Sequence, residues 1–236
     1  MIPLRDHNRP RTPPLLTYAL IAANVAVFMY QLQLGLTSKA GEAFVFQYGV
    51  VPYLLTQDLH LASLSTPFTS LFMHGSLMHI ASNMWFLHVF GDNVEDALGR
   101  ARFALLYVAT GLLAVVAQVL VDPESRIPMI GASGAIAGVL GAYLRLFPSA
   151  RIVTLIPILF FFIVRDLPAV FFNVIWFGFQ LLSGLGSLGM NSGEGGVAFF
   201  AHIGGFLAGL WLLGVLGVRR NRTAGFRVSR ERFDYR

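Results

Sequence analysis

Four apolar stretches in this 236-residue sequence are each long enough to cross a lipid bilayer. A spanning helix needs about 20 mostly apolar residues, because each residue adds about 1.5 Å and the hydrocarbon core is about 30 Å thick. The chain is 56% hydrophobic and only 12% charged, which is too apolar for an ordinary soluble domain. We therefore predict a multi-pass membrane protein. The four stretches are residues 15–34, 103–121, 168–188 and 196–218.

Two shorter apolar stretches, 76–90 and 133–147, are predicted to complete a set of six membrane helices. A short helix reaches one membrane face when the loop at its other end dips into the protein. A further stretch, 152–164, contains Pro157 and lies between Arg151 and Arg165. Runs of this length rarely span, so we expect it to be interfacial or re-entrant.

Basic residues predict the orientation of the six helices. With six spans, all but two of the 17 Lys and Arg residues lie on the side of the two termini, and Lys39 and Arg126 lie opposite. Cytoplasmic loops carry the excess of positive charge, so both termini are expected in the cytoplasm. The membrane is expected to be that of a bacterial cell. The predicted fold is an all-α polytopic membrane protein with a large first outer loop. Its expected parts are a tail (1–14), a membrane domain (15–218) and a basic tail (219–236).

Composition also narrows the chemistry. The chain has no cysteine, which excludes disulfides, thiolate nucleophiles and thiolate metal sites. Its net charge of +5 comes from residues that flank the apolar stretches, so no folded platform for nucleic acid is expected. No metal or other cofactor is predicted.

Ser133 is one of four polar residues in the predicted spans that we single out as candidate site residues. Such residues are costly in lipid and mark candidate functional sites. Ser133 lies in the sequence GASGA, residues 131–135, where the glycines allow close approach and a sharp turn. The start of a helix also offers free backbone N–H groups that suit an oxyanion. The alternative is that Ser133 is a helix N-cap in a glycine-rich packing motif.

His202 lies in AHIGG, residues 201–205, and is expected roughly 9 Å below the outer surface. Ser133 is expected at similar depth, because the short helix that it begins starts well inside the membrane. Each helix carries a glycine pair at a spacing that permits close contact. A histidine beside a serine supplies the general base that an unactivated hydroxyl lacks. The alternative for His202 is a structural hydrogen bond between helices.

His79 and Asn83 are four residues apart and therefore share one face of the second span. Their side-chain donors could stabilise an anionic tetrahedral intermediate. The alternative is a polar clamp between helices. His74, five residues before His79, is expected to diverge from it on the helix.

At these residues the sequence resembles the rhomboid family of intramembrane serine proteases, and the resemblance covers nearly the whole chain. The segments that carry it are FMHGSLMHIASN at 72–83, GASGA at 131–135 and AHIGG at 201–205, in the family's order. The connection through Glu95 and Gly99 to the third span is also similar.

The resemblance implies roles for these residues. Ser133 and His202 would form a catalytic dyad, and His79, Asn83 and the Ser133 backbone N–H would line an oxyanion hole. The implied substrate is a transmembrane helix of another protein, cut within or beside the membrane, and lipids are the other partner. The fifth span and residues 184–196 would act as a mobile gate and cap, with Trp176 as a gate residue.

Two departures from the family pattern are visible. The first outer loop reads LASLSTPF at 61–68, where the family often carries a Trp-Arg pair. Ala137 stands one turn after the serine, where the family often has an aromatic residue that stacks on the histidine.

Two other functions remain open. One is a catalytically silent or weak rhomboid-like protein that binds membrane helices. The other is a transporter or channel in which buried polar residues line a pathway. The clustering of the polar residues in the outer half of the spans favours a hydrolase over a conduit.

Overall fold

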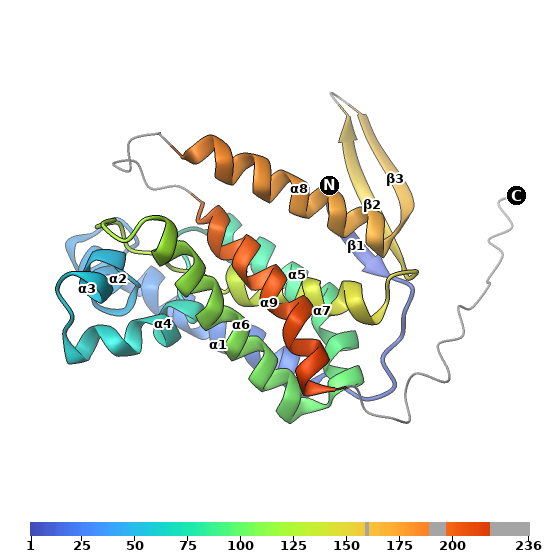
Figure 1. Cartoon of the computed structure of the whole chain (residues 1–236), viewed down its shortest axis with the longest axis horizontal. Helices are drawn as coiled ribbons and strands as arrows, with labels where there is room; N and C mark the ends of the chain where they lie inside the picture. The colour runs from blue at the N-terminus through green and yellow to red at the C-terminus, as the bar shows by residue number, and fades with distance from the viewer. Residues whose placement is uncertain (159–160, 189–196, 218–236) are drawn as a thin grey trace, which may run out of the picture.

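The computed structural model describes residues 1–158, 161–188 and 197–217 as a helical bundle with a small sheet beside one end (Figure 1). The long helices and α7 form the bundle, and short helices connect the first two of them. The bundle helices are α1 (Leu15–Leu34), α5 (Leu77–Leu98), α6 (Arg100–Val121), α7 (Ser133–Leu146), α8 (Ala169–Ser187) and α9 (Phe199–Leu216). The short elements are α2 (Lys39–Tyr48), α3 (Pro52–Thr56), η1 (Leu61–Ser65), α4 (Thr66–Thr69) and η2 (Ser70–Phe72).

Four of these helices, α1, α6, α8 and α9, are long and apolar enough to cross a membrane. They coincide with the four predicted long stretches, which confirms the prediction of a multi-pass membrane protein. The 14-residue α7 is shorter than a usual span, and α5 extends eight residues beyond the predicted end at Phe90. The number of six spans and their orientation therefore stay predictions.

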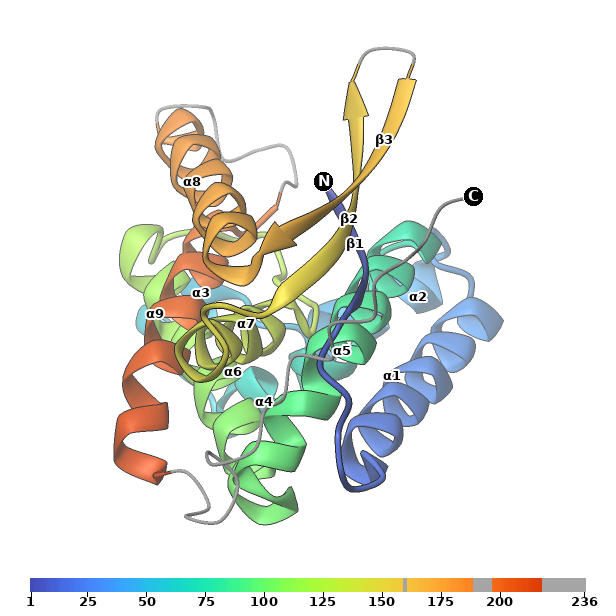
Figure 2. The ribbon, with the colours of Figure 1, turned by 90° about the vertical axis from the view of Figure 1, so that its right-hand side faces the viewer.

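The prediction of an all-α chain is wrong, because a three-stranded antiparallel sheet with the order β1-β2-β3 is present. Its strands are β1 (Ile2–Asp6), β2 (Arg151–Ile158) and β3 (Phe161–Pro168). The stretch expected to be interfacial or re-entrant is a hairpin in which Arg151 pairs with Pro168 and Ile158 with Phe161. Its branched and aromatic side chains suit strands, and short apolar runs do not distinguish strand from helix. The hairpin projects from the bundle on the side of α8 (Figures 1 and 2).

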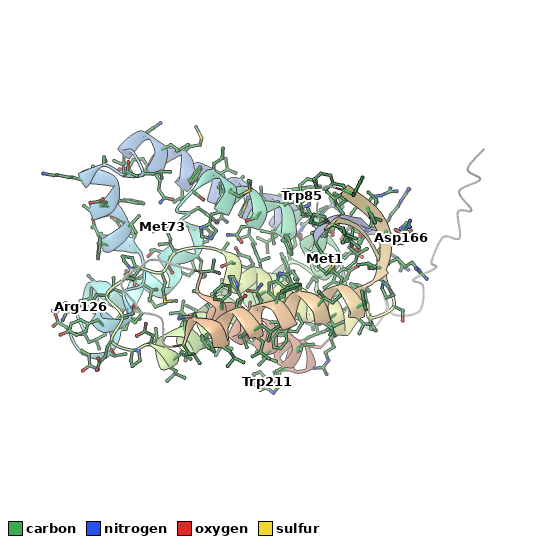
Figure 3. The ribbon with its side chains drawn as sticks, turned by 90° about the horizontal axis from the view of Figure 1, so that it is seen from above. Met1, Met73, Trp85, Arg126, Asp166 and Trp211 are labelled. Carbon is green, nitrogen blue, oxygen red and sulfur yellow. The ribbon has the colours of Figure 1, made fainter. Side chains whose placement is uncertain are left out.

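The sheet and the connection between α6 and α7 lie at opposite ends of the molecule. Figure 3 shows Asp166 of β3 near one end and Arg126 near the other. At the Arg126 end, Val50 and Met129 exchange backbone hydrogen bonds, which tie the first connecting segment to the α6–α7 connection. This separation agrees with a chain whose two loop systems face opposite sides of a bilayer.

The centre of the bundle is α7, whose residues from Gly134 to Tyr143 are all buried. Small residues allow its neighbours to approach closely. A Cβ atom at Gly138 would lie 2.3 Å from the Thr110 side chain of α6, and one at Gly141 would lie 2.1 Å from the Phe206 oxygen of α9. Such contact distances exclude larger side chains, so the position of α7 depends on these glycines.

Asp6 joins β1 to the helical bundle. Its carboxylate accepts hydrogen bonds from the Tyr143 hydroxyl of α7 (2.6 Å) and from the Asn93 amide of α5 (2.9 Å). Burial raises the pKa of Asp6 to about 7, the hydrogen bond from Tyr143 opposes this rise, and the Asp92 carboxylate adds to it. The Asp6 carboxyl group therefore keeps its proton to a higher pH in the folded chain than in the unfolded chain.

We expect Asp6 to make stability depend on pH. Below about pH 4 the raised pKa of Asp6 adds up to about 4 kcal/mol to the free energy of unfolding. This contribution is lost as the pH rises through about 7. In Asp6→Asn, which is neutral throughout, the part of the fall that Asp6 causes should vanish, and the part caused by Asp92, whose pKa is raised to about 6 by burial, should remain. Thermal unfolding in one detergent from pH 4 to 8 checks it, with the exposed Glu42→Gln as control. An Asp6→Asn protein with the slope of the wild type would contradict the assignment.

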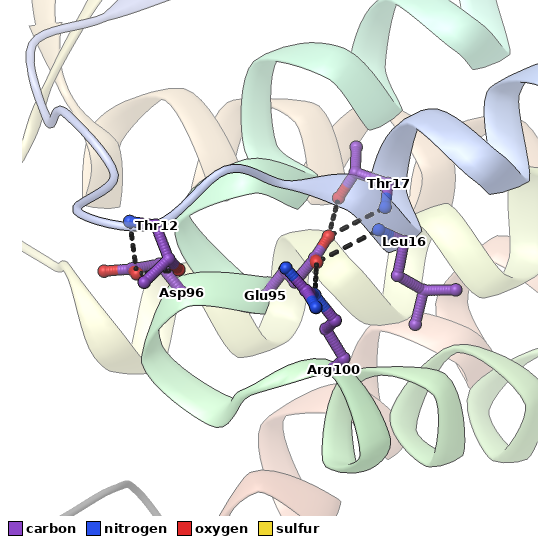
Figure 4. A network of polar contacts seen from close by, with 6 residues as sticks. All are labelled: Thr12, Leu16, Thr17, Glu95, Asp96 and Arg100. Carbon is purple, nitrogen blue, oxygen red and sulfur yellow. Dashed lines mark hydrogen bonds and ion pairs between the residues drawn. The ribbon is translucent and has the colours of Figure 1, made fainter.

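Glu95 on α5 caps the start of α1, which has no side-chain cap of its own (Figure 4). The 3%-exposed carboxylate accepts from the backbone N–H groups of Leu16 (3.0 Å) and Thr17 (2.7 Å) and from the Thr17 hydroxyl (2.8 Å). Arg100 lies 3.7 Å away as an ion-pair partner. Three donors on one buried carboxylate satisfy the exposed N–H groups of the helix end and fix α1 against α5.

Replacing Glu95 is expected to cost much more stability than replacing its ionic partner. Glu95→Gln turns one acceptor oxygen into a donor facing the α1 N–H groups, and we expect a loss of about 3 kcal/mol. Arg100→Gln removes a 58%-exposed side chain and should cost less than about 1 kcal/mol. Unfolding by titration with a denaturing detergent measures both. Equal losses would show that the ion pair, and not the cap, holds this junction.

Candidate active site

Ser133 is the first residue of α7, at the end of the helix that lies beside α9. The N-cap is Ala132, and among the described residues no side chain caps this helix. The reading of Ser133 as a structural N-cap therefore has no support. The preceding Gly131 has φ +131°, a conformation that side-chain-bearing residues rarely adopt, so glycine is needed for this turn. The turn leads into α7 at Ser133.

Helices α7 and α9 meet through their backbones just beside Ser133 and His202. A Cβ atom at Gly205 would lie 2.0 Å from the Gly134 oxygen, and one at Gly134 would lie 3.7 Å from the Ala201 oxygen. Gly134 follows Ser133 in the sequence, and Ala201 precedes His202. The glycine spacing predicted this close contact, which brings the serine and the histidine into one region of the molecule.

His79 of α5 supplies a hydrogen-bond donor near the same point, and Asn83 lies one helical turn further along α5. His79 Nδ1 accepts from the Gly75 N–H (3.4 Å), which leaves the proton on Nε2. A Cβ atom at Gly131 would lie 2.8 Å from His79 Nε2 and 3.6 Å from Ser133 Oγ, so both atoms face Gly131. The Asn83 side chain is buried, and its Nδ2 has no partner among the described residues. A buried amide donor without a hydrogen-bond partner lowers the stability of a fold, so its presence indicates a functional role.

Gln180 of α8 is a site residue that the sequence analysis missed. Its Oε1 lies 2.7 Å from His202 Nδ1. The signal was present, because Gln180 is one of the few polar residues in a mostly apolar predicted span. What the sequence did not show is which helix it faces.

Trp176, predicted as a gate residue, contacts the histidine directly. Its ring centroid lies 6.2 Å from that of His202 at an interplanar angle of 35°, and 5.9 Å from that of Phe206. Ala137, which replaces the aromatic residue often found after the serine, is buried in the core. An aromatic residue on α8 therefore provides the ring contact that α7 lacks in this chain. The gating role of Trp176 stays a prediction.

His74 lies next to His79, contrary to the expectation that the two diverge. Their ring centroids are 4.9 Å apart in an edge-on arrangement, and His74 is fully buried. The reason is that α5 begins only at Leu77, so His74 precedes the helix and does not follow its periodicity.

Of the predicted cap, residues 189–196 lie outside the described ranges, as does the basic tail 219–236.

Comparison with known proteins shows to which family the chain belongs. The profile of the Rhomboid domain matches residues 62–219. Rhomboid protein 1, mitochondrial, of Saccharomyces cerevisiae is 30% identical over 217 residues, which are 88% of this chain and 56% of that protein. The human presenilin-associated rhomboid-like protein, mitochondrial, is 29% identical over 194 residues, 81% of this chain and 46% of that protein. Rhomboid protease GluP of Bacillus subtilis is 31% identical over 215 residues, 91% of this chain and 37% of that protein.

The chain thus spans between about a third and just over half of the length of these relatives. Two of them are mitochondrial by name and one is bacterial, so the bacterial cell membrane stays a prediction while the integral membrane character holds. The matched segment begins in η1 and takes in every candidate residue described above, from His74 to His202. Because the profile covers more than half of the chain and all of these residues, the chain belongs to the rhomboid family.

Proposed function

We propose that this chain is an intramembrane serine endopeptidase that cuts transmembrane segments of other proteins through a Ser133–His202 dyad. The observation that carries the proposal is the meeting of α7 and α9 at Gly134, which follows Ser133, and at Ala201, which precedes His202. A serine and a histidine at such a contact suit the roles of a nucleophile and its base. Membership of a family that includes a named protease supports the proposal further.

The chemistry follows from the groups present. His202 Nε2 takes the proton of the Ser133 hydroxyl as Oγ attacks the scissile carbonyl, and the protonated imidazole then gives it to the leaving amine. This step leaves an acyl group on Ser133. Water, activated by the same histidine, then releases the new carboxyl end and restores the serine. The proton is exchanged between serine, histidine and the two products, so no other co-reactant is needed.

The negative oxygen of the tetrahedral intermediate needs donors that are in place before the reaction. Asn83 Nδ2 and His79 Nε2 are two such donors, and the backbone N–H of Ser133, at the free start of α7, is a third. Preorganised donors in a site that excludes water act most strongly where charge develops. Among these donors, His79 Nε2 and Ser133 lie on the same side of Gly131, which supports acyl transfer as the reaction class.

The substrate class follows from the location of the site. A membrane helix satisfies its own backbone hydrogen bonds, so it must be locally unwound before a serine can reach a carbonyl. We propose that such a helix enters beside α8, with lipids as its surroundings and Trp176 at the point of entry. Segments with helix-breaking residues should be cut most readily.

The test is cleavage of a model transmembrane substrate by the full chain in lipid vesicles, together with covalent labelling of Ser133 by a fluorophosphonate. We expect the wild type to cut and to be labelled, and Ser133→Ala to do neither. A folded wild-type protein that neither cuts any of several substrates nor reacts with the probe would favour the catalytically silent, helix-binding alternative.

A further inference from the structure

We propose that Gln180 and Trp176 of α8 are positioning residues for His202, so that the base is aligned only while the C-terminal part of α8, residues 174–187, lies against α9. The inference rests on the proposed function and adds a regulation of the same site. It makes one helix responsible both for admitting the substrate and for orienting the base.

The hydrogen bond between Gln180 and His202 selects the form of the imidazole that catalysis requires. An amide oxygen only accepts hydrogen bonds, so His202 Nδ1, which lies 2.7 Å from Gln180 Oε1, carries the proton. The lone pair is then on Nε2, the nitrogen that has to take the proton of Ser133. In soluble serine proteases a carboxylate performs this task. Here a neutral amide does so, without placing a charge at membrane depth.

Trp176 restrains the same ring by contact. It lies four residues before Gln180, so both side chains project from one face of α8. The indole lies 6.2 Å from the His202 ring and 5.9 Å from Phe206, and Phe177 adds a contact with Phe206 at 4.9 Å. The two contacts on His202 act on different degrees of freedom. Gln180 selects the protonated nitrogen, and Trp176 limits rotation of the ring.

Helix α8 is anchored firmly only at its first turns. The Ala169 N–H donates to the Ala150 oxygen (2.7 Å), and Phe172 and Asn173 are fully buried. Beyond Asn173, Gly184 is the only buried residue of the helix. Figure 1 shows α8 along one side of the bundle, and Figure 2 shows it at the edge of the molecule. The contacts of Trp176 and Gln180 that orient the histidine are thus among the few that hold this C-terminal part on α9, and moving it away removes both of them together.

This arrangement differs measurably from a helix that acts as a gate alone. If Gln180 only held the gate shut, Gln180→Met would loosen α8, speed the entry of a transmembrane substrate and leave the reactivity of Ser133 toward a small probe unchanged. If Gln180 positions the base, the same substitution slows both reactions. The two possibilities thus predict opposite signs for cleavage and different results for labelling.

The first experiment compares Gln180→Met, which keeps the length of the side chain but has no amide, with Gln180→Glu, which keeps an acceptor oxygen. The neighbouring Phe179→Leu, at a 61%-exposed position, is the control. We expect Gln180→Met to lower both kcat and the rate of fluorophosphonate labelling by about 10- to 100-fold, with KM nearly unchanged. Gln180→Glu should recover most of both rates, and Phe179→Leu should match the wild type. Melting temperatures of all variants verify the fold.

The second experiment locks α8 against α9. A Cβ atom at Gly184 would lie 3.3 Å from the Phe199 Cβ, close to the separation in a disulfide, and the chain has no other cysteine. The oxidised Gly184→Cys/Phe199→Cys protein should label at Ser133 at the wild-type rate but fail to cut a transmembrane substrate. Reduction should restore cleavage.

The outcomes separate this inference from the proposed function. A wild type that is neither labelled nor active removes the proposed function and this inference with it. A wild type that is active, with Gln180→Met labelled equally fast or cutting faster, overturns the inference alone. Slower labelling of the oxidised double-cysteine protein than of its reduced form would also overturn it, because closure would then misalign the base.

Discussion

Ser133→Ala, His202→Ala and the double variant should all lose cleavage of a transmembrane substrate to about the same extent, at least about 10³-fold in kcat. The serine forms the bond and the histidine moves its proton, so neither retains its catalytic role without the other. Once one is absent, removal of the second should cost almost nothing more. Two independent residues would instead give losses that multiply.

Single-turnover cleavage in vesicles, with enzyme in excess, measures these rates without interference from slow product release. Ser65→Ala and His88→Ala are matched controls, since they remove the same side-chain types at positions away from the site. Retention of cleavage by Ser133→Ala would exclude Ser133 as the nucleophile. A double variant that is much slower than both single variants would show that the two residues do not act as a unit.

Asn83 should show a large loss of activity with almost no loss of stability. Removing one donor to the oxyanion lowers kcat by about 10²–10³-fold, and KM should hardly change because the charge appears only in the transition state. The Asn83 Nδ2 atom is buried without a partner among the described residues, so the resting fold loses no hydrogen bond from it. Asn83→Leu should therefore melt at the same temperature as the wild type or higher.

His79→Leu gives the contrasting result within the same site. Its kcat should fall by a similar factor, but its ring also accepts the Gly75 N–H, so it should lose stability as well. Kinetics and melting curves of both variants in one detergent measure the two effects. If Asn83→Leu keeps full activity, the amide is not an oxyanion donor. If it unfolds as readily as His79→Leu, the amide holds the helices together, as the clamp alternative states.

The membrane spans were predictable because a physical length decides them. The hydrocarbon thickness sets a threshold of about 20 apolar residues, and α1, α6, α8 and α9 meet it in the sequence and in the structure. Polar residues inside apolar stretches were equally visible, since each must be compensated. This is how Ser133, His202, His79 and Asn83 could be singled out, and their catalytic roles remain predictions for the experiments above.

The sheet and the full length of α5 were not predictable in this way. Strand β1 pairs with β2, although Asp6 and Ile152 are far apart in the sequence, and no local pattern specifies such a partner. The end of α5 contains Glu95 and Asp96, which look like loop residues in a sequence. They are helical and buried because the start of α1 and Thr12 donate hydrogen bonds to them.

By itself the sequence determined that this chain lies in a membrane, that it carries a serine and a histidine beside closely packing glycines, and that it resembles rhomboid proteases. Hydropathy, spacing and motif are properties of short segments, which is why they suffice for these conclusions. Only the tertiary structure decided that Gln180 and Trp176 reach His202 from α8. The sequence of a helix predicts which side chains share a face. The packing of one helix on another decides which residues that face contacts.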